Sequence, residues 1–253
     1  MTVTALGSAD AFCSAGRGHT CWLIEDALGA CAVDFGATAL QAMQRLGRDP
    51  AVLQAVHFTH LHGDHIGGWP FLLVDAVYRL QRTAPLVVTG PPGTRDRLQA
   101  LWAACYARAA ARPLPFPLEV RELRPGDAAL VCGRPVRAFE AQHMTPPDLA
   151  LSLRIGDLAF TGDTGRIAAG LCDGAAVLFA ECTEMRQAAG EVRQASGVRP
   201  QASGHRHLNW EDLGAALPEV PRIVLAHLGA EARAGIPRDA GVHVCDDLDV
   251  FEL

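Results

Sequence analysis

Four histidines and one aspartate lie within nine residues of this 253-residue chain, between positions 57 and 65. Such a cluster is costly to bury, because each imidazole and carboxylate needs a polar partner. A metal ion can be the partner of several of them, and imidazole combined with carboxylate suits a borderline or hard divalent ion. The segment therefore predicts a metal site. The alternative, a polar surface loop that happens to be rich in histidine, is disfavoured by other ligand-type residues further along the chain.

The spacing of the residues in the cluster indicates which local structure carries them. The pattern His-x-His-x-Asp-His occupies positions 60–65, directly after an apolar run over 51–59. That run has the length and composition of a strand buried on both faces. Residues two apart cannot share one helix face, so we expect a loop at the strand end that wraps around ions. His60 and His62 can present two nitrogens to one ion, which leaves Asp64 and His65 to point toward a second.

Three more polar residues follow strand-like segments at a distance from the cluster: His143, Asp163 and His227. Polar side chains at strand ends can converge on one rim of a sheet and form a site. Each residue alone could be a hydrogen-bonded histidine or a turn aspartate, but the cluster makes a ligand role the better interpretation. The predicted metal ligands are therefore His60, His62, Asp64, His65, His143, Asp163 and His227.

The composition restricts the chemistry that the chain can carry out. All 22 basic residues are arginine, which excludes Schiff-base lysine chemistry, a P-loop lysine and a Ser-Lys dyad. The net charge of -6 argues weakly against a partner that consists mostly of phosphate backbone. The eight cysteines form no C-x-x-C pair, so we expect reduced thiols in a cytoplasmic protein. We expect neither a signal peptide nor a membrane span.

Periodicity predicts strands and helices in both halves of the chain. Strands are expected over 1–7, 20–25, 30–34, 51–59, 86–89, 118–123, 129–131, 136–141, 150–155, 158–161, 177–181, 222–226 and 242–251. Helices are expected over 37–46, 71–82, 94–112 and 208–217, the last with Asn209 as its N-cap. Strand-rich halves that each contain helices favour an α/β sandwich of two sheets, in one domain over residues 1–253.

Several short motifs resemble the metallo-β-lactamase superfamily and, within it, the ribonuclease Z-like phosphodiesterases. They are Phe58–His65, Gly90–Gly93, Phe160–Thr164 and Glu181–Thr183, with Leu6–Ser8 and Val33–Gly36 also fitting. The resemblance covers nearly the whole chain. It implies a four-layer αββα sandwich that holds two divalent metal ions, usually zinc, with manganese or iron as alternatives.

The resemblance also implies how the ligands are shared between the ions. The first ion would be held by His60, His62 and His143, and the second by Asp64, His65 and His227. Asp163 would bridge them, with a water or hydroxide between the ions. In some relatives the residue that matches Asp64 also orients the attacking hydroxide.

A second pair, His207 and Glu181, matches a histidine and a glutamate that serve the departing oxygen in the ribonuclease Z branch. A histidine oriented by a carboxylate is a suitable general acid. The alternatives are that His207 is a surface histidine at a helix N-terminus, or that His205 takes its place or contacts phosphate. We expect His57 to be structural and His19 to be a loop residue that could contact substrate.

Two departures from the ribonuclease Z pattern concern the substrate. The Pro-x-Lys-x-Arg-Asn-like loop of the tRNA-processing enzymes is matched here by Phe12–His19, which keeps at most Arg17. Only a short strand pair fits between His143 and Asp163, where long family members insert a tRNA-gripping arm. We therefore predict a metal-dependent phosphodiesterase that acts on a small phosphodiester or a nucleotide-like substrate.

Other functions stay open at this point. The same scaffold could carry a carboxyl-ester, lactone or thioester hydrolase, or a tRNA 3′-processing endoribonuclease. A non-catalytic member that has lost its metals is disfavoured, because all seven ligand positions are filled. Nucleic acid is a disfavoured partner that the sequence does not exclude, no membrane partner is expected, and a homodimer is left open because relatives are often dimers.

Overall fold

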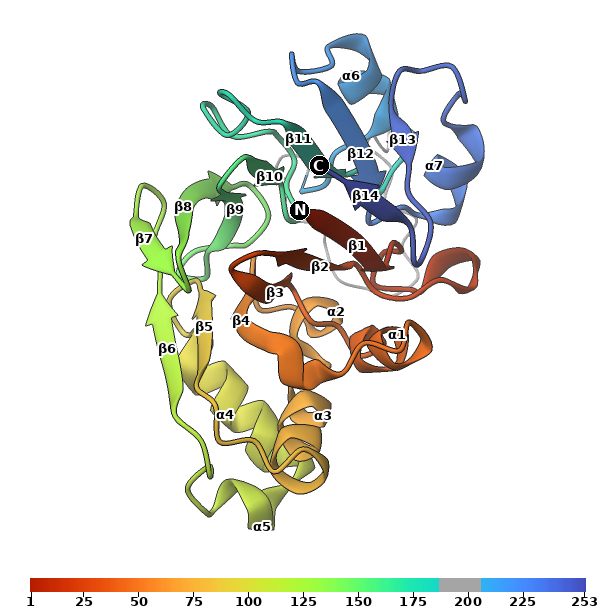
Figure 1. Ribbon diagram of the computed structural model, residues 1–253. Coiled ribbons are helices and arrows are strands. Elements are labelled where there is room, and N and C mark those ends of the chain that lie inside the picture. Colours follow the sequence, from red (N-terminus) through yellow and green to blue (C-terminus); the bar gives the residue numbers. More distant parts are fainter. Residues whose placement is uncertain (187–205) are drawn as a thin grey trace, which may run out of the picture.

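The computed structural model describes residues 1–186 and 206–253. These residues form two seven-stranded sheets that pack face to face, with helices on both outer faces (Figure 1). The predicted αββα sandwich is confirmed.

The first sheet has the strand order β14-β1-β2-β3-β4-β5-β6. Its strands are β1 (Thr2–Gly7), β2 (Cys21–Asp26), β3 (Gly29–Val33), β4 (Leu53–His57), β5 (Leu86–Gly90), β6 (Leu118–Glu122) and β14 (Val250–Glu252). Strands β3 to β6 run parallel to one another. Their carboxyl ends therefore lie at one edge of the sheet, and the histidine cluster follows β4 at that edge.

The second sheet has the order β13-β12-β11-β10-β9-β8-β7. Its strands are β7 (Ala128–Val131), β8 (Arg134–Ala141), β9 (Ala150–Ile155), β10 (Leu158–Phe160), β11 (Val177–Glu181), β12 (Arg222–Ala226) and β13 (His243–Val244). Strands β10 to β13 are parallel, so the residues that follow β10, β11 and β12 also share one edge.

Three apolar layers hold the sandwich together. Between the sheets, the Trp22 ring packs on Phe179 with centroids 4.5 Å apart. Outside the first sheet, side chains such as Val56 and Val88 pack against α1 (Ala39–Arg45), α3 (Trp69–Val74) and α4 (Thr94–Cys105). Outside the second sheet, Leu178 and Leu225 pack against α6 (Trp210–Ala215) and α7 (Ala230–Gly235). Burial of apolar surface on both faces of each sheet explains why the central strands read as continuous apolar runs.

Some predicted elements were wrong in detail. The helix expected over 94–112 is interrupted at Tyr106, which leaves helical geometry with φ -139° and ψ 61°, and α5 (Ala107–Ala110) follows it. The Tyr106 ring packs on Trp102 at 5.0 Å, a tertiary contact that propensity does not reveal. The helix over 71–82 begins at Trp69 as α3 and continues as a π-helical turn, Asp75–Arg79.

The single strand expected over 242–251 is two strands in different sheets. Strand β13 pairs with β12 of the second sheet, whereas β14 pairs with β1 of the first. The chain crosses between the sheets at Asp246–Asp249, where three aspartates interrupt the apolar pattern. Helix α7 was not predicted. None of the described helices is long and apolar enough to cross a bilayer.

Candidate metal centre

All seven predicted ligand residues come together at one edge of the sandwich. His60 lies just beyond β4, His143 just beyond β8, Asp163 beyond β10, and His227 directly after β12. His62 contacts His143, 81 positions away, and Asp64 contacts His227, 163 positions away. The cluster between 60 and 65 also contains a short helical turn, α2 (Gly63–Ile66), so the expected loop was only partly right.

One group of ligand atoms consists of three imidazole nitrogens. Nε2 of His60 and Nε2 of His143 lie 3.1 and 3.0 Å from Nδ1 of His62. The Nδ1 of His143 donates to the carbonyl of Arg206, so its Nε2 carries a lone pair when the ring is neutral. Burial lowers the pKa of His143 to about 4 and that of His60 well below its usual value, which keeps both rings neutral.

The Nε2 of His60 carries a lone pair for a similar reason. The Thr59 hydroxyl donates its hydrogen to Asp34, so it can only accept from Nδ1 of His60, which lies 3.1 Å away. The hydrogen of the neutral His60 ring is therefore on Nδ1, and Nε2 has the lone pair. Two lone pairs thus face a single nitrogen of His62, which has at most one hydrogen to offer. A cation satisfies all three nitrogens at once, so these residues fit a metal ion.

A second group combines two imidazoles with two carboxylates: Asp64, His65, Asp163 and His227. Nε2 of His65 lies 3.2 Å from Asp64 and 3.3 Å from Asp163. Nε2 of His227 lies 3.3 Å from Asp64 and 3.4 Å from Asp163. Burial opposes protonation of His65 and His227, but the carboxylates that they face raise the pKa of both rings. A divalent cation would take the place of these protons between the same nitrogens and carboxylate oxygens.

Asp163 touches both groups. Its Oδ1 faces His65, and its Oδ2 lies 3.8 Å from His60 and 3.7 Å from His143. The residue is only 3 % exposed. A single buried carboxylate thus lies between the two sets of nitrogens.

The backbone is tightly constrained where it delivers these side chains. Gly162 has φ +57°, and a Cβ there would meet the Cβ of Thr59 at 2.8 Å and the carbonyl oxygen of Leu151 at 2.9 Å. Asp34 and His227 adopt left-handed conformations, with φ 58° and 51°, although neither is glycine. Non-glycine residues in this region carry strain that tends to be kept at functional sites.

His207 and Glu181 also come together, next to His227 of the second ligand group. Nδ1 of His207 lies 3.0 Å from Oε2 of Glu181, and the His207 ring stacks on that of His227 at 5.7 Å. Burial opposes protonation of His207, but the hydrogen bond and charge of Glu181 outweigh it and raise the pKa of His207 to about 9. His205, the alternative to His207, lies outside the described residues.

Three residues to which the sequence analysis assigned no role hold the predicted ligands in place. Asp34 accepts from His65, Arg206 accepts from His143 through its carbonyl, and the Thr183 hydroxyl lies 2.9 Å from Nδ1 of His227. Hydrogen bonds of this kind fix the tautomer and orientation of metal-binding histidines. Asp34 and Thr183 each follow a strand, which is the signal that could have identified them.

His57 and His19 lie outside the ligand groups. His57 is fully buried, and its Nδ1 contacts the hydroxyl of Thr89 at 2.8 Å. His19 lies in the loop before β2, and its backbone amide donates to Thr38.

Comparisons with known proteins identify a family and several relatives. The family described as anti-Pycsar protein Apyc1 matches residues 1–191. Ribonuclease Z of Methanosarcina acetivorans is 29% identical over 146 residues, which cover 58% of this chain and 46% of that protein. Ribonuclease Z of Haloferax volcanii is 32% identical over 146 residues, covering 57% of this chain and 44% of that protein. The chain thus spans about half the length of the curated relatives it matches.

The fold is shared with a solved structure of low sequence identity. The metallo-β-lactamase fold protein YhfI from Bacillus subtilis superposes with a TM-score of 0.72 and 18% identity, covering 99% of this chain and 98% of that one. The resemblance to the metallo-β-lactamase superfamily that the motifs indicated is confirmed.

Proposed function

Because the chain belongs to the anti-Pycsar protein Apyc1 family, within the metallo-β-lactamase superfamily, we propose that it is a metal-dependent phosphoric diester hydrolase. The observation that carries the proposal is the pair His207 and Glu181, whose contact of 3.0 Å sets a histidine beside the two ligand groups. Hydrolysis of a diester is promoted by an electrophilic centre for the phosphate and, where the departing oxygen is a poor leaving group, by a proton donor for that oxygen. The ligand groups and His207 would meet these two needs.

Two divalent ions are assigned to the seven ligands. His60, His62 and His143 would hold one ion, Asp64, His65 and His227 the other, and Asp163 both. When bound, such a pair lowers the pKa of a water and neutralises charge that develops on phosphate oxygens. The imidazole-rich donor set suits zinc, with manganese and iron as alternatives.

The chain's own residues would position and protonate the reacting groups. Glu181 accepts from the amide of Thr164 and the hydroxyl of Thr183 as well as from His207, so its carboxylate is held in one orientation. With Nδ1 of His207 bound to Glu181, Nε2 is the nitrogen that would deliver a proton to the departing oxygen. Asp64, at the rim of the second group, would orient the attacking water.

A small phosphodiester such as a cyclic nucleotide suits the chain better than a long RNA. The net charge is -6 and the chain has no lysine, whereas backbone-binding proteins depend on basic residues to neutralise phosphates. The segment between His143 and Asp163 contains only β9, β10 and their loops, which leaves no room for an RNA-binding arm. The curated relatives named ribonuclease Z nevertheless make pre-tRNA the second candidate substrate.

The proposal is tested with purified protein loaded in turn with zinc, manganese and iron. Turnover of bis(p-nitrophenyl) phosphate and of 3′,5′-cyclic nucleotides is measured beside cleavage of a pre-tRNA transcript, a lactone and a thioester. Turnover of the small diesters well above that of the other substrates is expected. Absence of diester turnover with every metal contradicts the proposal, and faster lactone or thioester hydrolysis would move the function to carbonyl chemistry.

A further inference from the structure

A cleft of about 630 Å³ opens directly beside the ligand His143. The loop between β8 and β9 forms one wall, and Arg166 and Arg206 contribute to the rest. The volume falls in the range of small-molecule sites, about 300–1,000 Å³, and far exceeds what a phosphate group needs. The cleft can therefore accept the organic part of a diester whose phosphate lies at the metal ligands.

The walls of the cleft combine apolar surface with balanced charge. Met144, Pro146 and Leu149 supply apolar surface, and the two arginines are matched by two carboxylates, Glu140 and Asp148. Among the described residues that line the cleft the positive and negative charges balance, so these residues offer no excess positive charge to attract a second phosphate. Apolar walls with donors and acceptors between them suit a flat group that has apolar faces and a polar edge.

Arg206 connects this cleft to the ligand groups. Its carbonyl accepts the Nδ1 hydrogen of His143 at 2.9 Å, and its guanidinium donates to the hydroxyl of Thr145 at 2.6 Å. A guanidinium has five N–H donors, and the hydrogen bond to Thr145, the one it makes within the described residues, uses one of them. The carbonyl belongs to the backbone, so replacing the side chain tests the role of the guanidinium separately.

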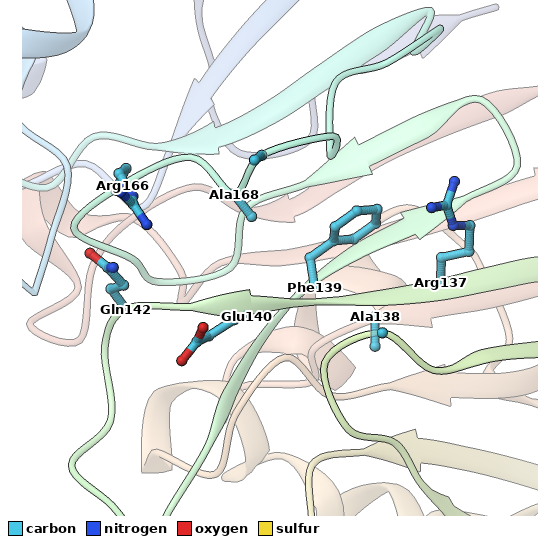
Figure 2. Close-up of a pocket in the computed structure, with 9 residues that line it drawn as sticks. Arg137, Ala138, Phe139, Glu140, Gln142, Arg166 and Ala168 are labelled. Carbon is cyan, nitrogen blue, oxygen red and sulfur yellow. The ribbon is translucent and has the colours of Figure 1, made fainter.

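Arg166 stands between the cleft and a second, smaller hollow of about 280 Å³. Figure 2 shows this second hollow, with Arg166 and Gln142 at one end and Arg137 at the other. Arg137 stacks over the ring of Phe139 at 5.2 Å and does not line the cleft. It provides a matched control, an exposed arginine in the neighbouring hollow.

We propose that the cleft beside His143 binds the nucleobase of a nucleotide diester, with Arg206 and Arg166 donating hydrogen bonds to acceptor atoms on the edge of the base. The apolar side chains of the β8–β9 loop would contact the faces of the base. This assignment rests on the proposed function for the position of the phosphate, and it makes Arg206 and Arg166 determinants of substrate specificity.

The test compares kcat/KM for a 3′,5′-cyclic nucleotide with kcat/KM for methyl p-nitrophenyl phosphate, a diester without a base. In Arg206→Ala and Arg166→Ala the ratio of the two values is expected to fall about tenfold, mainly through KM of the nucleotide. Arg137→Ala should keep the wild-type ratio. Arg206→Lys keeps the charge but loses the planar fork of the guanidinium, so its ratio should lie between those of the wild type and Arg206→Ala.

Binding of adenosine, measured by calorimetry on the metal-loaded protein, tests the cleft without any turnover. The wild type should bind adenosine, and the Arg206→Ala and Arg166→Ala variants about tenfold more weakly. An unchanged ratio in both alanine variants, or a wild type that does not bind adenosine, overturns the inference. If no diester is hydrolysed while adenosine binds in an arginine-dependent way, the proposed function fails and the binding site stands.

Discussion

The Nδ1 atom of His65 lies 2.8 Å from a carboxylate oxygen of Asp34, and both side chains are buried where the two sheets meet. Asp34 also accepts hydrogen bonds from the amide and hydroxyl of Thr59, the residue before His60. One carboxylate therefore orients a histidine of the second ligand group and the backbone that leads into the first.

Replacing this carboxylate should weaken metal binding. Asp34→Asn keeps the shape of the side chain but removes the charge that orients His65, and loss of such a partner typically reduces metal affinity about 10- to 100-fold. Competition with a chromophoric chelator measures the change. Asp157→Asn, at an exposed turn between β9 and β10, is the control and should bind like the wild type. Equal affinity in the Asp34 and Asp157 variants would contradict the role of Asp34.

The proposed acid should matter most when the departing oxygen is a poor leaving group. His207→Ala removes the proton donor, so an alkyl or ribosyl diester should slow about 100-fold or more, whereas a nitrophenolate departs without protonation. Steady-state kinetics on a series of diesters of graded leaving-group pKa gives the slope that reports this difference. Glu181→Gln should steepen the slope in the same direction, because the histidine loses its charged partner. A uniform loss across the series would exclude His207 as the acid.

Buried His57 should make stability depend on pH. Burial lowers the pKa of His57 from 6.5 to about 4, with the charge of Arg134 acting in the same direction. The unfolded chain therefore binds a proton below pH 6.5 that the folded chain takes up only near pH 4. The folded protein should therefore lose about 3 kcal/mol of stability as the pH falls from 6.5 to about 4, and this stability is fully present above pH 6.5.

Urea unfolding of the wild type and of His57→Asn, at pH 7 and at closely spaced values down to pH 4.5, isolates this contribution. The ligand histidines titrate in both proteins, so the difference between the two free energies of unfolding reports on His57 alone. That difference should shrink toward acid pH. Parallel curves for the two proteins would show that His57 is not the group responsible.

The close approach at Gly162 should be needed for the position of Asp163. Gly162 and Gly156 have nearly the same φ, +57° and +55°, but only Gly162 has atoms within 4 Å of an added Cβ. Gly156→Ala should cost about 1 kcal/mol of backbone strain. Gly162→Ala should cost about 1–3 kcal/mol more, because Thr59 or the Leu151 carbonyl must move. Unfolding free energies and bound metal are measured for both, and equal values would show that the contact is unimportant.

Much of the candidate site could be predicted from the order of residues. The cluster between 60 and 65, and the single polar residues His143, Asp163 and His227, each follow an apolar run, and parallel strands place such positions at a common edge. Strand β11, predicted over 177–181, was found at Val177–Glu181. Other layers cover both faces of these strands, so their burial is visible in the sequence as a local run of apolar residues.

Other features depend on which segments meet in three dimensions. The pairing of β14 with β1, the break at Tyr106 and the cleft beside His143 all arise from contacts between distant parts of the chain. The hydrogen bonds to the ligands are equally non-local: Asp34 and His65 are 31 positions apart, Thr183 and His227 44, and His143 and Arg206 63.

The residue types and their periodicity were thus sufficient to predict a two-sheet sandwich and the seven candidate ligand residues that gather at one of its edges. The tertiary structure was needed to show which nitrogen of each histidine faces the ligand groups, and that Asp163 lies between those groups. The reason is physical: a strand's burial follows from its own side chains, whereas the orientation of an imidazole follows from the hydrogen bond made by its other nitrogen. Here those partners, Asp34, Arg206 and Thr183, come from other strands and loops of the folded chain.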